Sequence, residues 1–237
     1  MMATYKMFVN MIKQISKEMM MVMLMIAPVI MGALFKFGIP LLESKVLSNY
    51  GWQDILVPYY ELLSWLIAMV LGILFAFVGG LVVLGEFDEN VAKYIVVTPA
   101  GIKGYLSSRI VMPSLVSGIA ACILIPVFAL CKIDIFTLVI MIVFNMLSGI
   151  VTSFLVVAIS SNKVEGMAVG KLAGLFGATF FIPLIISSKI KYVFCLFPMY
   201  YIGQWTVDGN AINIIISSLL FVVWIYFLYS KFKKKMY

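Results

Sequence analysis

The chain has 237 residues, of which 64% are hydrophobic and only 11% are charged, so it lacks the polar surface that a water-soluble domain of this size needs. With a mean hydropathy of +1.14, it is expected to fold in lipid as a single membrane domain. Histidine is absent, which removes a common general base and metal ligand, and the net charge of +7 comes from basic residues scattered between apolar segments rather than gathered on a nucleic-acid-binding face.

Residues 5–18 are predicted to form an amphipathic helix. Its apolar positions recur at helical spacing, and lysines and other polar residues occupy the opposite face. The apolar positions are Met7, Phe8, Met11, Ile12, Ile15 and Met19. We expect this helix to lie at the membrane interface with its lysines facing anionic headgroups. Packing of the apolar face against the rest of the protein is the alternative, and the two arrangements are compatible.

Six apolar segments are each long enough for a helix to cross a hydrocarbon core of ~30 Å. They are residues 19–42, 58–84, 110–131, 135–160, 168–187 and 211–230. Only residues 132–134 separate the third segment from the fourth, so these two are predicted to form an antiparallel hairpin. The predicted fold is therefore all-α, with six transmembrane helices after an interfacial N-terminal helix.

The basic residues predict how the chain is oriented. If the N-terminus is cytoplasmic, the cytoplasmic side carries Lys6, Lys13, Lys17, Lys93, Lys103, Arg109, Lys163, Lys171, Lys231, Lys233, Lys234 and Lys235. The outer side then carries Lys36, Lys45, Lys132, Lys189 and Lys191. Cytoplasmic segments of membrane proteins are enriched in lysine and arginine, so both termini are predicted to be cytoplasmic.

The most informative segment, residues 86–105, joins the second and third spans. Its acidic residues, Glu86, Asp88 and Glu89, are predicted to begin a short helix, where they would favour the positive end of the helix dipole. Val91, Tyr94, Ile95 and Thr98 follow at helical spacing. Thr98-Pro99 ends the helix, because a residue before proline avoids helical geometry. Such a helix suits the docking of a soluble partner, and simple packing at the bilayer surface is an equally good explanation.

Familiar catalytic and metal-binding patterns do not account for this chain. The run Gly166–Lys171 has one residue too few between its glycines for a phosphate loop, and a leucine follows its lysine. The three cysteines, Cys122, Cys131 and Cys195, lie in apolar surroundings without CxxC spacing, which favours buried thiols. We therefore predict no catalytic residue, no metal site and no cofactor in this chain.

The segment 86–105 resembles the signature that follows the second helix of the ABC type-2 permeases, the membrane subunits of many bacterial ATP-driven exporters. The matching positions are Glu86, Asp88, Glu89, Thr98, Pro99 and Tyr105. Phe87 stands where the family has a basic residue, and Asn90-Val91 replaces Gly-Thr. The layout of six spans, with an aromatic segment before the last one, is also similar to that family over essentially the whole chain.

The resemblance implies a permease subunit in a bacterial plasma membrane, paired with a second permease chain and with two copies of a separate ATPase that binds ATP and Mg. Coupling to the ATPase would involve the six matching residues and Tyr94. An apolar substrate path would be lined by Phe75, Phe77, Phe176 and Phe180. An external gate would include Phe197, Pro198, Tyr200 and Tyr201, although an aromatic belt at the headgroups explains those residues equally well. The expected cargo is hydrophobic or amphipathic, such as a drug, an antimicrobial peptide or a lipid-like molecule.

Two other classes of function compete with this interpretation. An ion-coupled secondary transporter usually keeps ionisable groups at mid-membrane, whereas Lys36 and Glu61 are predicted near the outer ends of their spans, and no internal repeat is evident. An intramembrane enzyme would need a nucleophile with a base, or a cluster of metal ligands.

Overall fold

The computed structural model describes residues 2–47, 56–91, 94, 101–186 and 188–236. Within these ranges every regular element is a helix, which confirms the all-α prediction. Six helical stretches are long and apolar enough to cross a membrane: Met19–Lys45, Val57–Asp88, Gly101–Phe128, Ile135–Ile159, Lys163–Ile185 and Ile212–Lys235. The prediction of six spans is therefore confirmed for the part of the chain that the structure describes.

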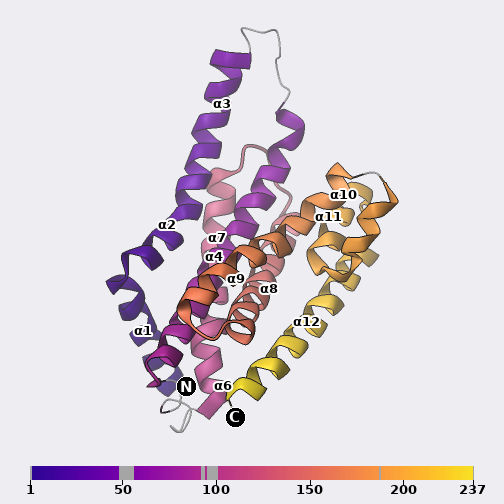
Figure 1. The fold of residues 1–237 in the computed structure, drawn as a ribbon. Coiled ribbons are helices and arrows are strands. Elements are labelled where there is room, and N and C mark those ends of the chain that lie inside the picture. The colour runs from indigo at the N-terminus through magenta and orange to yellow at the C-terminus, as the bar shows by residue number, and fades with distance from the viewer. Residues whose placement is uncertain (1, 48–55, 92–93, 95–100, 187, 237) are drawn as a thin grey trace.

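The helices follow one another as a simple up-and-down series (Figure 1). The first half comprises α1 (Met2–Lys17), α2 (Met19–Ala33), η1 (Leu34–Gly38), α3 (Ile39–Leu42), η2 (Glu43–Leu47), η4 (Val57–Tyr59), α4 (Tyr60–Asp88), α6 (Gly101–Leu106), η5 (Ser107–Val111) and α7 (Met112–Phe128). The second half comprises α8 (Ile135–Ile159), α9 (Lys163–Ala178), η6 (Thr179–Phe181), α10 (Ile182–Ile185), η7 (Lys189–Leu196), α11 (Pro198–Asp208) and α12 (Ile212–Met236).

Helix α4 is the central element of the bundle. It packs against α2, α7, α8 and α9, and most of its side chains are buried. Two of its glycines allow close helix contacts: a Cβ atom at Gly72 would lie 2.4 Å from the carbonyl oxygen of Asn145, and one at Gly79 would lie 2.4 Å from that of Arg109. Small residues permit such backbone approach in membranes, where packing rather than the hydrophobic effect holds helices together.

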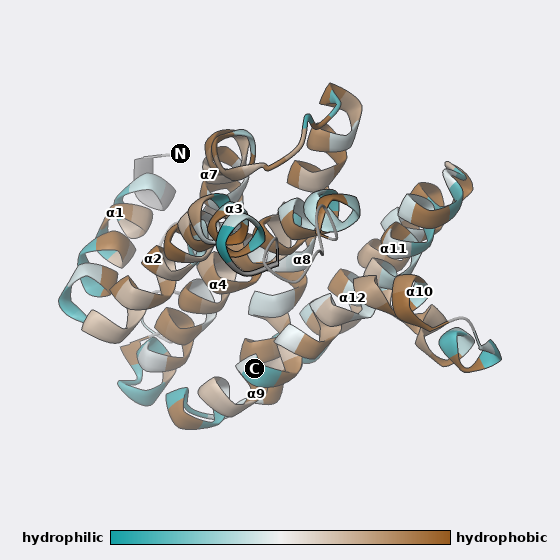
Figure 2. Ribbon diagram, turned by 90° about the horizontal axis from the view of Figure 1, so that it is seen from above, coloured by the Kyte–Doolittle hydropathy of each residue, from teal (hydrophilic) through white to brown (hydrophobic). Residues whose placement is uncertain are grey.

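The outer surfaces of the helices are also apolar (Figure 2). Ile119 on α7, Val143 on α8 and Val223 on α12 are examples of exposed aliphatic side chains. Helices that are hydrophobic on all sides are expected where lipid surrounds the protein. Together with the six long apolar helices, this surface identifies a multi-pass membrane protein.

Both ends of the described chain lie at the same end of the bundle, next to α1 and α6, whereas α10 and α11 lie toward the other end (Figure 1). Helix α1 packs against α2, α4, α6 and η5. Its Met11 and Ile15 are buried, while Lys6, Lys13 and Lys17 are exposed. The apolar face of α1 therefore contacts protein, and its position at the membrane interface stays a prediction.

Candidate functional site

A buried charge pair joins the end of the second span to the start of the third. Glu86, in the last turn of α4, pairs with Arg109 in η5, with 2.5 Å between Oε1 of Glu86 and Nη2 of Arg109. The Nε atom of Arg109 donates to both carboxylate oxygens, at 3.1 and 3.2 Å. The hydroxyl of Tyr105 donates to Oε2 of Glu86 at 2.8 Å. Only 3% of Glu86 and 2% of Arg109 are exposed, so the charge pair is almost fully buried. We call Glu86, Tyr105 and Arg109 the clamp.

The clamp corrects one detail of the sequence analysis. Glu86 and Asp88 lie at the C-terminal end of α4 and Glu89 is its C-cap, so these residues do not begin a separate helix. A carboxylate at a helix C-terminus faces the negative end of the dipole, which is unfavourable on its own. The guanidinium of Arg109 offsets this cost, because its planar fork binds a carboxylate through two parallel hydrogen bonds.

Asn90 follows Glu89, the C-cap of α4, and its φ of 59° lies in the left-handed region. Asparagine adopts this conformation more readily than most residues other than glycine. The ABC type-2 signature that this segment resembles has glycine here, and asparagine is compatible with the same left-handed conformation. Val91 and Tyr94 beyond it are helical, and 74% of Tyr94 is exposed. Thr98 and Pro99 lie outside the described residues, so the end of the predicted coupling helix stays a prediction.

Asp88 connects α4 to the start of α9. Its Oδ2 accepts a hydrogen bond from the backbone N–H of Lys163 at 3.0 Å. The side chain of Asn162 caps the same helix by accepting from the N–H of Glu165 at 2.9 Å. The N–H groups in the first turn of a helix have no acceptor within the helix and need one from elsewhere. Asp88 supplies one for α9 and thereby links the end of α4 to the start of α9.

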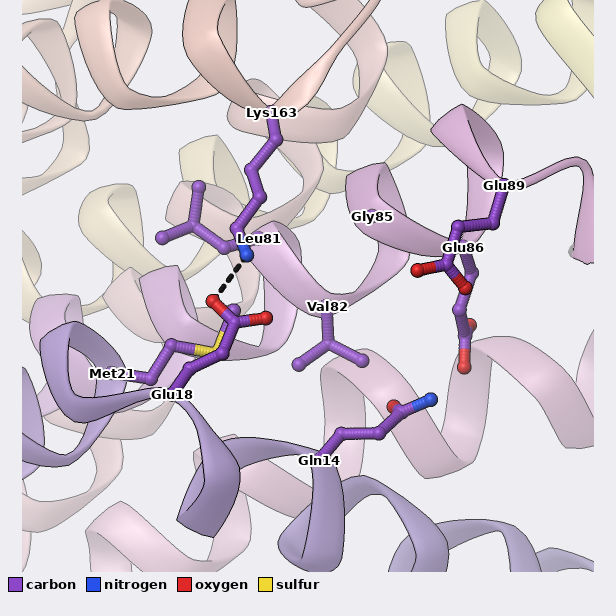
Figure 3. A pocket seen from close by; sticks show the side chains of 9 residues that line it. All are labelled: Gln14, Glu18, Met21, Leu81, Val82, Gly85, Glu86, Glu89 and Lys163. Carbon is purple, nitrogen blue, oxygen red and sulfur yellow. Dashed lines mark hydrogen bonds and ion pairs between the residues drawn. The ribbon is translucent and has the colours of Figure 1, made fainter.

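A small polar pocket lies between α1, α4 and α9 (Figure 3). Its volume is about 70 Å³, and its polar lining residues are Gln14, Glu18, Glu86, Glu89 and Lys163. The ammonium group of Lys163 forms an ion pair with Glu18 across it. Among the described residues, no group of three or more acidic residues or cysteines has a geometry that suits a metal ion. The pocket therefore offers hydrogen-bonding groups beside the exposed residue Glu89.

The C-terminal helix α12 also contacts the inner end of α4. The ammonium group of Lys235 donates to the carbonyl oxygens of Val157, at 3.0 Å, and Ser160, and it lies 5.2 Å from the centre of the Phe87 ring. Phe87 also packs against Phe232 of α12. The end of α4 is thus in contact with α1, η5, α9 and α12.

The four phenylalanines predicted to line a substrate path lie in different surroundings. Phe75 borders an apolar cavity between α1, α2, α4 and α7. Phe77 packs over Gly170 of α9. Phe176 is buried against Phe221 and Trp224 of α12, and Phe180 stacks on Trp65 with 5.0 Å between ring centres. The structure therefore does not bring the four rings together at one surface of this chain.

The predicted external gate forms one compact unit around α11. Phe197 stacks on Trp224, and the carbonyl oxygen of Pro198 accepts a hydrogen bond from the hydroxyl of Ser217 at 2.8 Å. Tyr200 is buried and contacts Tyr201 edge to face. Burial raises the pKa of both tyrosine hydroxyls, so both stay protonated at neutral pH.

The role of Arg109 was not predicted from the sequence, where this residue was counted only among the cytoplasmic basic residues. The available signal was that Arg109 is the only arginine among 17 basic residues. Lysine forms compact point charges that can reach water, whereas a buried, bidentate pair with a carboxylate requires arginine. The ion pair between Glu18 and Lys163 was also not predicted, because the two residues lie 145 positions apart in the sequence.

Comparison with known families places the chain. A family model described as fluoroquinolones export permease protein Rv2686c-like matches residues 11–230. No curated protein and no solved structure shows a significant match. The family match runs from α1 to α12 and includes every residue of the clamp, and the chain therefore belongs to the Rv2686c-like family of fluoroquinolones export permease proteins.

Proposed function

We propose that this chain is the permease subunit of an ATP-driven drug exporter, and that the end of α4 transmits force from a separate ATPase. The family is one of drug export permeases, which supports the transport role. The resemblance of residues 86–105 to the ABC type-2 signature supports the ATP-driven class. The sequence shows no phosphate loop, so an ATP-driven cycle would use an ATPase site on a partner.

The observation that carries the proposal is the clamp. Glu86 precedes the segment 87–104, and Tyr105 and Arg109 follow it. Because both of these residues bond to the buried carboxylate of Glu86, the clamp holds the two ends of the segment next to each other. Force applied to this segment would therefore reach α4 and η5 together. In this model Glu86 and Tyr105 position the segment, and exposed residues such as Glu89 and Tyr94 contact the partner.

Movement of the segment would reach the whole bundle through the contacts already described. Asp88 is bonded to α9, Phe87 packs on α12, and Arg109 donates to the carbonyl oxygen of Met7 in α1. Closure of an ATPase dimer would then tilt several spans together and bias the bundle between inward- and outward-open states. The chain performs no bond chemistry in this cycle.

The assembled exporter is proposed to contain two permease chains and two ATPase copies, with ATP and Mg bound by the ATPase. The end of the bundle with both termini carries most of the basic residues, which supports a cytoplasmic location for both termini in a bacterial plasma membrane. A hydrophobic or amphipathic drug is the proposed substrate, and fluoroquinolones are the first candidates because the family description names them.

Charge reversal tests the coupling role. Glu89→Lys changes an exposed charge at the inner end of α4, and Glu61→Lys makes the same change at the outer end of the same helix. In inverted vesicles that contain the ATPase, Glu89→Lys is expected to abolish ATP-dependent drug uptake at normal expression, whereas Glu61→Lys retains it. Normal uptake by Glu89→Lys would refute the coupling role. Uptake that survives ATP depletion but stops when the ion gradient collapses would instead establish a secondary transporter.

A further inference from the structure

An apolar cavity lies beneath the N-terminal helix. It has a volume of about 200 Å³ and lies between α1, α2, α4 and α7. Phe8, Met11, Ile12 and Ile15 of α1 face Phe75 of α4 and Val116 of α7 across it. An apolar cavity of ~150 Å³ already holds a benzene-sized ligand, so this one has room for a short length of hydrocarbon chain.

The chemistry of the cavity selects its occupant. All of its lining residues are apolar, and it offers neither a charged group nor a side-chain hydrogen-bond donor. Sites for drug-sized ligands combine apolar walls with a few polar groups that fix orientation. A zwitterionic or peptide ligand would lose hydrogen bonds on entering this cavity, whereas a saturated chain would lose none.

The surroundings supply a place for a charged headgroup. Ile12 lies at the edge of the cavity and 49% of it is exposed. Successive residues of a helix are rotated by about 100°, so Lys13 projects from the neighbouring, solvent-facing side of α1 together with Lys6 and Lys17. A molecule whose chain passes Ile12 into the cavity would place its head beside the Lys13 ammonium group.

We propose that this cavity binds one acyl chain of an anionic membrane phospholipid, whose headgroup lies next to Lys13. The bound chain completes the packing of the apolar face of α1, where Met11 and Ile15 are buried but 49% of Ile12 is exposed. Because Arg109 of the clamp donates to the carbonyl oxygen of Met7, the lipid would support the helix that contacts the clamp. Phe75 is also one of the residues predicted to line the substrate path, so competition between lipid and drug is part of the test.

A photoactivatable phosphatidylglycerol with a diazirine in its acyl chain tests the proposal on the full-length protein in vesicles. We expect cross-links on the peptides that carry Ile12, Phe75 and Val116. Val116→Phe fills the cavity and should lower labelling roughly tenfold, the change expected when about two methylene groups lose their burial. Val127→Phe, the same substitution on an outward-facing position of α7, should leave labelling unchanged.

Further variants separate the site from a folding defect. Val116→Ala enlarges the cavity and should retain labelling even where it lowers stability. Lys13→Gln should remove the preference for phosphatidylglycerol over phosphatidylcholine, while Lys103→Gln, at another exposed lysine near the same end, should keep it. Equal labelling of the wild type, Val116→Phe and Val127→Phe would overturn the proposal, as would competition by a fluoroquinolone in place of long-chain lipid. A short-chain phosphatidylglycerol that competes fully would also overturn it, because the chain would then not be what is bound.

Discussion

Glu86 and Arg109 show how a single pair of charges defines the end of a membrane span. Both side chains are almost fully buried, and among the described residues Arg109 donates to Glu86 and to the carbonyl oxygen of Met7. A buried pair of this kind adds little net stability compared with apolar residues, but the loss of one partner leaves the other charge uncompensated. The main effect of the clamp is therefore to fix the end of α4 against η5, rather than to add net stability to the fold.

Glu86→Gln removes one charge of the clamp and should lower the free energy of unfolding by about 3–5 kcal/mol, because Arg109 stays buried without its counter-ion. The double variant Glu86→Leu with Arg109→Met should recover most of this loss. Thermal unfolding of the purified chain in detergent measures both. A double variant as unstable as Glu86→Gln would contradict the assignment of the cost to an unpaired charge.

Asn90 provides a second prediction at this scale. Its left-handed φ of 59° costs most residues about 1–2 kcal/mol, but costs glycine very little. Asn90→Gly should therefore keep ATP-coupled transport, whereas Asn90→Val should weaken it at unchanged expression. Equal transport by the two variants would show that the backbone turn after α4 is not needed.

At the scale of helices, the spans were predictable because about 20 apolar residues in a row leave few alternatives to a membrane helix. The structure at the inner end of α4 was not predictable in this way, because the acidic residues Glu86, Asp88 and Glu89 form a local pattern that is typical of a helix start. Their partners, Arg109 and Lys163, lie 23 and 75 residues away in sequence, and a local pattern carries no information about them. The four predicted substrate-path phenylalanines lie in separate surroundings within this chain, and their role in a substrate path stays a prediction.

The packing of α4 can be tested with two glycines of the same helix. A Cβ atom at Gly79 would lie 2.4 Å from the carbonyl oxygen of Arg109, whereas one at Gly85 would meet no atom within 4 Å. Gly79→Ala should lower the free energy of unfolding by roughly 1–3 kcal/mol through overpacking. Gly85→Ala should be neutral or add up to ~1 kcal/mol through helix propensity. Unfolding curves in detergent would contradict this packing if the two variants behaved alike.

At the scale of the whole molecule, the described contacts converge on one end. The end of α4 touches α1, η5, α9 and α12, and both termini lie close by (Figure 1). A partner that pushes there would reach most of the bundle without a long chain of intermediate contacts. Among the described residues, the outer end packs through the aromatic side chains of α11 and α12 and through local hydrogen bonds to Asp208, rather than through a charge pair. This asymmetry supports the placement of the driving ATPase at the end that carries both termini.

Site-specific photo-cross-linking tests this placement most directly. Tyr94 and Tyr226 are each 74% exposed, the first in the coupling segment and the second on the lipid-facing side of α12. A photoreactive phenylalanine analogue at position 94 should cross-link to the ATPase in intact cells, and the same group at position 226 should not. A position-94 probe that reacts only with lipid, or that is reached by a membrane-impermeant reagent from outside the cell, would contradict the account.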